Sequence, residues 1–359
     1  MRALLLLLAL ASAPALAQNP NTDPAAYRAL FSVASLGVTN PPDSLLMGWT
    51  QHYRGAVPNS AFALAQAADG RTVWQFVGGR ASPEEARAGA LEGCTRSAAG
   101  IGAPPCRIIA TNGTVEGRAP FTPSNETIAR LRASPLHFHH GPQRAQGVLV
   151  YSHGRSGQGA DLRNSHVQGW VSRFNDAGWD VLRFDRDPND DATLTSLAQL
   201  NAALPELRQR GYGRIVLAGQ SRGAWHSLLA AAERPELIDA VLAIAPAAHG
   251  NSGAGHNAAL DEWRRIVVAL PAERVRIATV LFREDAFDPL PSARIERLEA
   301  QAARRRQPTL IISPARGPAD HGGGTNWQFT RDWSACLLAF VRDATPPTGT
   351  LREDCGDRR

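Results

Sequence analysis

Residues 214–233 read RIVLAGQSRGAWHSLLAAAE, and this stretch decides the fold of the larger part of the chain. Its first residues, Arg214–Ala218, are mostly apolar and predict a buried strand. Its last part, Ala224–Glu233, is rich in helix-forming residues. Between them, residues 219–223 read GQSRG. A strand, a sharp turn and a helix around such a serine are typical of a nucleophile elbow.

The elbow gives its residues physical tasks. Gly219 and Gly223 are expected where the backbone and the helix come too close for Cβ atoms. Ser221 is expected in a strained conformation that holds its hydroxyl out at the carboxyl edge of the sheet. The N-terminus of the following helix offers positive potential to an oxyanion that develops beside the serine. Ser221 is therefore the candidate nucleophile.

A serine hydroxyl is a poor nucleophile until a base takes its proton, and after an elbow the carboxylate and then the histidine follow in chain order. His321 stands just after the last predicted strand, Thr309–Ser313, and three glycines follow it directly. These glycines are expected to let the loop bend the imidazole back over Ser221. His249 and His256 follow the strand after the elbow and are expected to line the cleft.

The carboxylate is expected in the loop after the strand Arg276–Phe282, which holds Glu284, Asp285 and Asp288. Asp285 is favoured, because it is nearest the end of the strand on the turn side. Asp288, which precedes a proline, is the main alternative, and Glu284 is a weaker one. The choice depends on which carboxylate reaches Nδ1 of the imidazole, a distance that sequence spacing does not measure.

An oxyanion-binding site is expected where the first strong strand, Val148–Ser152, runs into the loop His153–Gly157. Two backbone N–H groups would polarise the carbonyl of a substrate. One belongs to Arg222, the residue after the nucleophile, and the other to Arg155 in the loop.

Together the His-Gly loop, the elbow, the acidic loop and the late histidine resemble the α/β-hydrolase family, over roughly Leu136 to Arg342. The arrangement is similar to the esterase and dienelactone-hydrolase branches, with a serine where the latter use cysteine. The resemblance implies a mostly parallel twisted sheet with helices on both faces, and hydrolysis of a small-molecule carboxylic ester through an acyl-enzyme. It implies no metal and no organic cofactor. Only Gly250 to Arg274 separate two of the strands, which leaves room for one helix and not for a large lid.

Other functions fit the same residues. A peptidase or an acyltransferase would use the same triad, and the preference for esters comes from the resemblance alone. A non-catalytic binding protein on a hydrolase scaffold is the alternative of another class. The presence of Ser221, His321, the His-Gly loop and a nearby aspartate argues against it.

The N-terminus predicts export. Met1–Ala17 has one charge, an apolar run and a small-residue cleavage site after Ala17, as in a secretory signal peptide. No later run is long and apolar enough to cross a bilayer. We expect a secreted or periplasmic protein. In such an oxidising compartment the four cysteines are expected to form two local disulfides, Cys94 with Cys106 and Cys336 with Cys355.

The chain is expected to have two folded parts. Residues 18–60 form an N-terminal extension, and residues 61–119 predict a β-β-α-β module whose helix starts at Ser82-Pro83. This module resembles a small secreted domain of unknown function, and a partner for it is unknown. A proline-containing linker, residues 120–135, leads to the hydrolase domain, residues 136–359.

Composition fits a globular protein and excludes a nucleic-acid partner. The 359 residues are 43% hydrophobic and 20% charged, which is too apolar for a disordered chain. All 38 basic residues are arginine, and with 33 acidic residues they give a formal charge of +5. Because acidic residues are interleaved almost everywhere, no basic patch is expected. The one basic run, Arg304–Arg306, ends a predicted helix, where cations suit the helix dipole.

Overall fold

A computed structural model of the chain describes residues 38, 45, 48–49, 53, 59–112, 114–116, 124–134, 137, 139–155, 161–163, 167–270, 275–352 and 355. The predicted signal peptide and its cleavage site lie outside the described residues. The chain divides into two compact units, whose main parts are Asn40–Arg118 and Ala119–Arg359. None of the helices in the described ranges is long and apolar enough to span a membrane.

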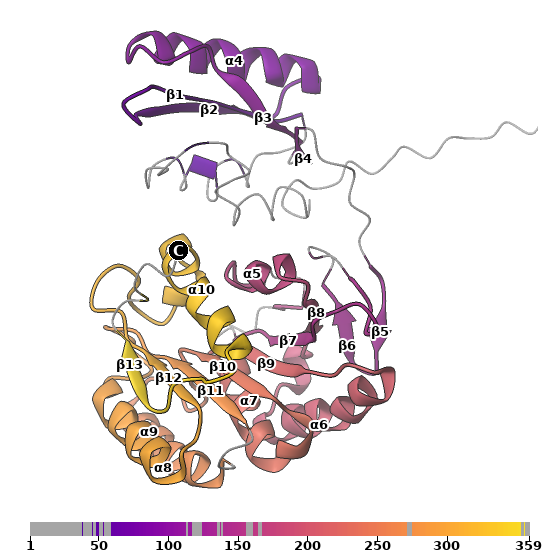
Figure 1. Cartoon of the computed structure of the whole chain (residues 1–359), viewed down its shortest axis with the longest axis vertical. Helices are drawn as coiled ribbons and strands as arrows, with labels where there is room; N and C mark the ends of the chain where they lie inside the picture. Colours follow the sequence, from indigo (N-terminus) through magenta and orange to yellow (C-terminus); the bar gives the residue numbers. More distant parts are fainter. Residues whose placement is uncertain are drawn as a thin grey trace, which may run out of the picture. The chain divides into compact units, whose positions relative to one another are not determined.

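The smaller unit is an antiparallel sheet with one helix (Figure 1). The predicted β-β-α-β elements are present, and a short strand β4 pairs with the last of them. The sheet has the order β2-β1-β3-β4. The bounds are β1 (Ala61–Gln66), β2 (Thr72–Val77), α4 (Pro83–Ala99), β3 (Arg107–Thr111) and β4 (Thr114–Val115).

Helix α4 begins at the predicted cap. The Ser82 hydroxyl accepts the N–H of Glu85 at 3.2 Å. The Glu85 carboxylate in turn accepts the N–H of Ala81 at 3.3 Å, one residue before the position that a capping box uses. Both bonds satisfy backbone donors at a helix end, where no intrahelical acceptor exists.

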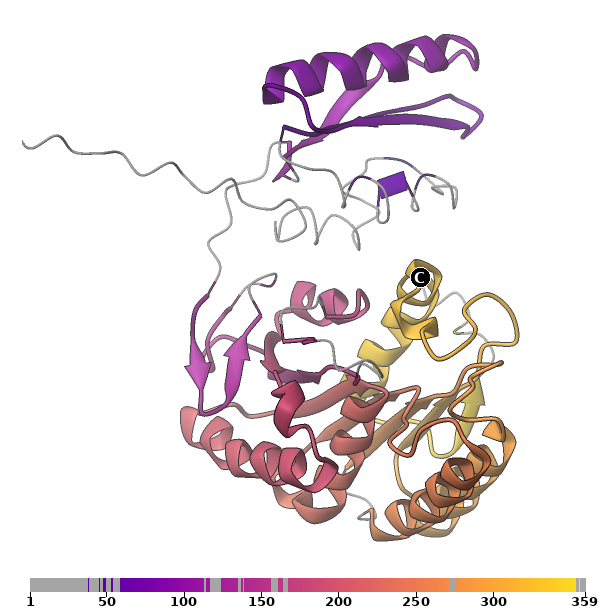
Figure 2. The same ribbon diagram turned by 180° about the vertical axis from the view of Figure 1, so that it is seen from behind.

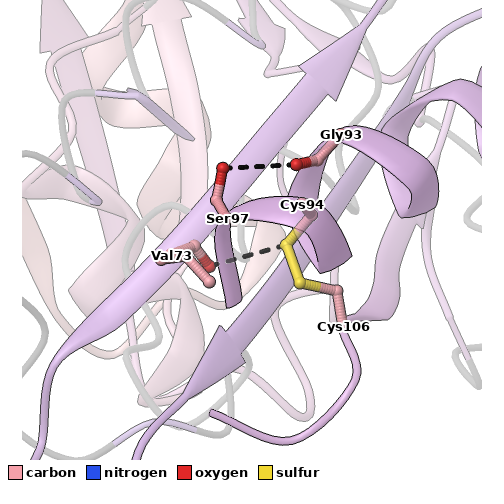
Figure 3. The surroundings of a disulfide bond; sticks show 5 residues. All are labelled: Val73, Gly93, Cys94, Ser97 and Cys106. Atoms are coloured by element: carbon pink, nitrogen blue, oxygen red, sulfur yellow. Dashed lines mark hydrogen bonds between the residues drawn. A yellow bond between two sulfur atoms is a disulfide. The ribbon is translucent and has the colours of Figure 1, made fainter. Parts of the chain in front are cut away.

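Small apolar side chains form the core between α4 and the sheet. Ala61 and Ala63 of β1 meet Ala86 and Ala90 of the helix, and all four are fully buried. Figure 3 shows the Cys94–Cys106 disulfide, which joins the helix to the residue before β3. The predicted pairing of the cysteines is confirmed, because the structure also joins Cys336 to Cys355 in the larger unit.

The larger unit is built on a nine-stranded sheet of order β13-β12-β11-β10-β9-β7-β8-β6-β5. Seven strands run parallel to one another: β13, β12, β11, β10, β9, β7 and β8. At the other edge, β6 runs antiparallel to β8, and β5 runs antiparallel to β6. The bounds are β5 (Thr127–Ile128), β6 (Leu131–Ala133), β7 (Val148–Ser152), β8 (Asp180–Phe184), β9 (Ile215–Gln220), β10 (Ala240–Ile244), β11 (Arg276–Val280), β12 (Thr309–Ile312) and β13 (Thr350–Arg352).

Helices cover both faces of this sheet (Figures 1 and 2). One face carries α5 (Val171–Asp176) and α10 (Trp327–Arg342), which contact each other. The opposite face carries α6 (Thr193–Arg210), α7 (Arg222–Glu233), α8 (Gly253–Ala269) and α9 (Pro291–Arg305). Strands enclosed on both sides bury every residue, as in β7, β8 and β10. Burial on both faces fits the continuous apolar run of β10.

The strand order, the two-sided helix layers and the elbow after β9 confirm the predicted α/β-hydrolase fold. As expected, the described residues between β10 and β11 form a single helix, α8. Parallel strands end at the same edge of a sheet, so the loops after β7, β9, β11 and β12 emerge together. These four loops carry the residues that the sequence singles out.

Candidate active site

Ser221 stands in the sharp turn between β9 and α7, with φ 55° and ψ −122°. Side-chain-bearing residues rarely adopt a positive φ, so neighbouring contacts must hold this conformation. The Ser221 N–H donates to the carbonyl of Ile244 at 3.0 Å, at the end of β10. Its own carbonyl accepts the N–H groups of Trp225 at 3.1 Å and Ala247 at 3.2 Å. The nucleophile elbow is therefore bonded into its own helix and into the neighbouring strand.

Close packing explains the two glycines of the elbow. A Cβ at Gly219 would lie 2.6 Å from the carbonyl oxygen of Ser152 and 2.6 Å from the carbonyl carbon of Gly223. A Cβ at Gly223 would meet the same Ser152 carbonyl even more closely. Only glycines let α7 start this close to the ends of β7 and β9.

Three predicted side chains form one hydrogen-bonded chain. The Ser221 hydroxyl lies 2.7 Å from Nε2 of His321. Nδ1 of His321 lies 2.9 Å from each carboxylate oxygen of Asp285. The Asp285 side chain is 2% exposed and that of His321 is 20% exposed, so the buried carboxylate stands behind a histidine that solvent reaches.

The loop after β11 separates its three acidic residues. The Phe287 N–H donates to Oδ1 of Asp285 at 2.8 Å, which fixes the orientation of this carboxylate. Asp288 is buried away from the imidazole, with Oδ1 3.4 Å from Nε of Arg294. Burial raises the pKa of Asp288. Glu284 is 73% exposed and pairs with Arg283. The structure thus brings Asp285 to His321 and leaves the two alternatives outside this chain of hydrogen bonds.

The His321 loop differs in one respect from the expectation. The left-handed residue is Asp320, with φ 61°, and not one of the glycines that follow. The glycines serve close packing instead: a Cβ at Gly323 would lie 2.7 Å from the ring of Phe282, and one at Gly324 would lie 2.5 Å from Ile244. They let the loop pack closely against Phe282 and Ile244.

Two side chains that the sequence did not single out contact His321, one at its backbone and one at its ring. The Gln220 amide donates to the His321 carbonyl at 3.0 Å, and the Phe287 ring lies 4.3 Å from the imidazole between centroids. Position 220, next to Ser221, could have suggested the first; no sequence signal points to the second.

The predicted oxyanion donors lie in the elbow itself and in the loop after β7. Arg222 is the first residue of α7, where a backbone N–H has no acceptor within its helix. Its guanidinium binds elsewhere, to the carbonyl of Asp191 at 3.0 Å and that of Ala248 at 3.3 Å. Arg155 stands in the loop after β7, next to Gly154, and its side chain is exposed.

His153 at the start of this loop is a neutral, structural histidine. Its Nε2 accepts the N–H of Arg186 at 3.1 Å, and its Nδ1 lies 2.6 Å from the carbonyl oxygen of Gly154, to which it donates. Burial and the nearby Arg186 guanidinium lower the pKa of His153 to about 4. The loop is therefore held by an imidazole that stays uncharged at neutral pH.

The two histidines that were expected to line the cleft, His249 and His256, bind other groups. His256 lies 2.9 Å from the carbonyl oxygen of Ala286 in the acidic loop, and His249 lies 2.6 Å from a carboxylate oxygen of Glu262. His137 lies between two serine hydroxyls. In the part of the chain that the structure describes, no three His, Cys, Asp or Glu residues are placed to hold a metal ion.

No protein-family model and no curated protein matches this sequence. Among solved structures, the chain is similar to Est1E from Butyrivibrio proteoclasticus with ferulic acid bound, at 13% identity over 55% of this chain and 88% of that one, with a TM-score of 0.41. It is also similar to the esterase Pf2001 of Pyrococcus furiosus, at 14% identity over 54% and 81%, with a TM-score of 0.42. A prolyl endopeptidase matches at 16% identity over 57% and 35%, with a TM-score of 0.41. The strand order and the elbow, rather than these distant likenesses, define the fold.

Proposed function

We propose that the protein is a serine hydrolase that cleaves carboxylic esters through an acyl-enzyme. The observation that carries the proposal is the continuous chain from the Ser221 hydroxyl through His321 to Asp285, with contacts of 2.7 and 2.9 Å. It stands at the edge of the sheet where four loops meet. A base within hydrogen-bond distance of the nucleophile and a carboxylate behind that base are the geometry of nucleophilic catalysis.

In the proposed acylation, Oγ of Ser221 attacks the ester carbonyl carbon while Nε2 of His321 takes the hydroxyl proton. Nδ1 keeps its proton, which is hydrogen-bonded to Asp285, and the buried carboxylate stabilises the imidazolium. The carbonyl oxygen becomes an oxyanion, which the backbone N–H groups of Arg222 and Arg155 would bind. The imidazolium then gives its proton to the leaving alcohol, and an acyl-Ser221 ester remains.

Deacylation repeats these steps with water. His321 takes a proton from a water molecule, whose oxygen attacks the acyl carbonyl. The second oxyanion collapses, Ser221 recovers its proton from His321, and a carboxylic acid leaves. Since α7 begins at Arg222, its positive N-terminal end lies beside both oxyanions. The two half-reactions consume the ester and one water molecule and need no oxidant or further co-reactant.

The preference for esters and the export of the protein are both part of this proposal. The same chemistry would cleave peptides or pass the acyl group to an alcohol. Export is proposed from the signal peptide, and the two disulfides agree with an oxidising compartment. For the smaller unit we propose a packing or partner-binding role without catalytic residues.

The test is hydrolysis of 4-nitrophenyl esters of increasing acyl length by the oxidised chain without residues 1–17, beside Ser221→Ala. Loss of the nucleophile should lower kcat by about 10⁴-fold or more. Ser227→Ala is the matched control, because this buried serine lies in α7, the helix that follows Ser221, and donates to the Gly223 carbonyl at 2.9 Å. It should stay within about tenfold of the wild type.

Equal activity in the wild type and Ser221→Ala would refute the assignment of the nucleophile. A peptide panel and an added alcohol acceptor, analysed for products, separate the alternatives. Activity on peptides alone would replace the ester proposal, and ester products of the alcohol in place of acid would show acyl transfer.

A further inference from the structure

A buried arginine stands beneath the predicted oxyanion loop. Arg186 follows β8 by two residues, and its side chain is 0% exposed. Its Nη2 donates to the carbonyl of His153 at 2.6 Å and to that of Gly154 at 3.0 Å. Its Nε donates to Asp191 at 2.8 Å. Two successive carbonyls of one loop thus turn toward a single guanidinium.

These contacts set the direction of two N–H groups. In a trans peptide the N–H points opposite to the carbonyl of the preceding residue, and the described chain contains no cis peptide bond. With both carbonyls on Arg186, the N–H groups of Gly154 and Arg155 point away from it. The Gly154 carbonyl also accepts from Nδ1 of His153 at 2.6 Å, so the peptide plane that contains the Arg155 N–H is held by two donors.

The loop passes directly beside the nucleophile. A Cβ built on Gly154 would lie 3.4 Å from Cβ of Ser221 and 2.5 Å from Oε1 of Gln220. The orientation of its peptide planes therefore matters at the place where an oxyanion would form.

We infer that Arg186 is a positioning residue that aims the Arg155 N–H into the oxyanion site. The inference rests on the proposed function. Arg186 itself stays buried and contacts no substrate. Its effect is on the transition state, because a donor that is fixed in advance needs no reorganisation when the charge develops.

The contacts of Arg186 are not those that stability alone would favour. Its Nη1 is buried without a hydrogen-bond partner among the described residues. Asp191 is the only carboxylate that it binds in the described ranges, and two of its bonds go to neutral carbonyls. Burying a charge with an unpaired N–H group is costly. We attribute the arrangement to its hold on the loop.

The experiment compares Arg186→Met with Asp191→Asn on one 4-nitrophenyl ester. Arg186→Met removes both carbonyl contacts. Asp191→Asn removes the charge of the ion-pair partner but leaves Nη2 on the two carbonyls. Each variant is assayed at least 15 °C below its own measured Tm, so that only folded protein is compared.

We expect Arg186→Met to lower kcat by about 10²- to 10³-fold, the effect of losing one oxyanion donor, with KM within about threefold. Asp191→Asn should stay within tenfold. Arg186→Lys keeps a cation that reaches at most one carbonyl and should fall between the wild type and Arg186→Met.

A second readout depends on the oxyanion and not on stability. A trifluoromethyl ketone forms a hemiketal oxyanion on Ser221, and its inhibition constant should rise in Arg186→Met by about the same factor as kcat/KM falls. Wild-type kcat and inhibition in folded Arg186→Met would refute this inference and leave the proposed function intact. If Arg186→Met does not fold, wild-type kcat and inhibition in Arg186→Lys refute it equally. A wild-type protein inactive on every ester would refute the proposed function, and this inference with it.

Discussion

Asp285→Asn should abolish most of the activity by shifting the proton of the His321 imidazole from Nδ1 to Nε2. Both oxygens of Asp285 lie 2.9 Å from Nδ1, so either orientation of an asparagine amide places its NH₂ group against this nitrogen. The Phe287 N–H selects the orientation in which the amide oxygen stays at its 2.8 Å contact. The NH₂ group then donates to Nδ1, and the imidazole carries its proton on Nε2.

An imidazole protonated on Nε2 cannot accept the proton of Ser221, whose hydroxyl lies 2.7 Å away. A wrong tautomer of this kind costs about 10⁴-fold in kcat, equivalent to about 5 kcal/mol of transition-state free energy. The folded structure should change little, because asparagine has the size of aspartate and keeps the bond to Phe287.

The matched control is Asp288→Asn in the same loop. Asp288 contacts Arg294 at 3.4 Å and makes no contact with the imidazole, so kcat should stay within about tenfold. Loss of this buried ion pair should instead lower the free energy of unfolding by about 3 kcal/mol. The assay is kcat on a 4-nitrophenyl ester, with urea unfolding of both variants. More than a tenth of wild-type kcat in Asp285→Asn, or an equal loss in Asp288→Asn, would refute the reasoning.

Acid should destabilise the fold between pH 6.5 and 4, because burial lowers the pKa of His153 to about 4 and that of His226 to about 3. The unfolded chain binds protons there that the folded chain does not, so the free energy of unfolding should fall by about 6 kcal/mol from pH 7 to 4. Urea unfolding should show this fall reduced by about half in His226→Leu, and an unchanged pH dependence would contradict it. Gly223→Ala should inactivate the protein and lower its free energy of unfolding by about 3 kcal/mol, since the new Cβ would overlap the carbonyl at the end of β7. The ester assay measures the activity and Tm measures the stability, and wild-type values of both would disprove the close packing. Replacing both residues of the Cys94–Cys106 disulfide by alanine should destabilise the smaller unit by about 3 kcal/mol, given a separation of 12 residues, and leave kcat unchanged. A fall in kcat would show that the two units depend on each other.

The elbow could be predicted from the sequence because every part of it is local. The apolar strand, the two glycines and the helix formers around Ser221 lie within twenty residues, and each favours the same turn. The alternation of strands and helices predicted the sheet and its helix layers for the same reason. Local patterning also placed His321 and the acidic loop at the carboxyl edge of the sheet.

Only the tertiary structure chose between the acidic residues. Asp285 meets a histidine 36 residues later in the chain, and His321 meets a serine 100 residues earlier. Neither distance follows from spacing, because three-residue differences within one loop decide which carboxylate points at the imidazole. The Phe287 N–H and the pairing of Asp288 with Arg294 make that decision, and both depend on how the loop packs.

Arg186 shows most clearly the difference between what the sequence contains and what the tertiary structure decides. Its place just after a buried parallel strand put it at the functional edge of the sheet, a signal that the sequence contained. Its role, however, comes from carbonyls more than thirty residues earlier in the chain, which only the pairing of β7 with β8 brings to it. The sequence by itself thus determined the fold, the candidate nucleophile and the loops that surround it. The tertiary structure decided which side chains meet, because hydrogen bonds form over about 3 Å, a distance far smaller than the uncertainty of any sequence pattern.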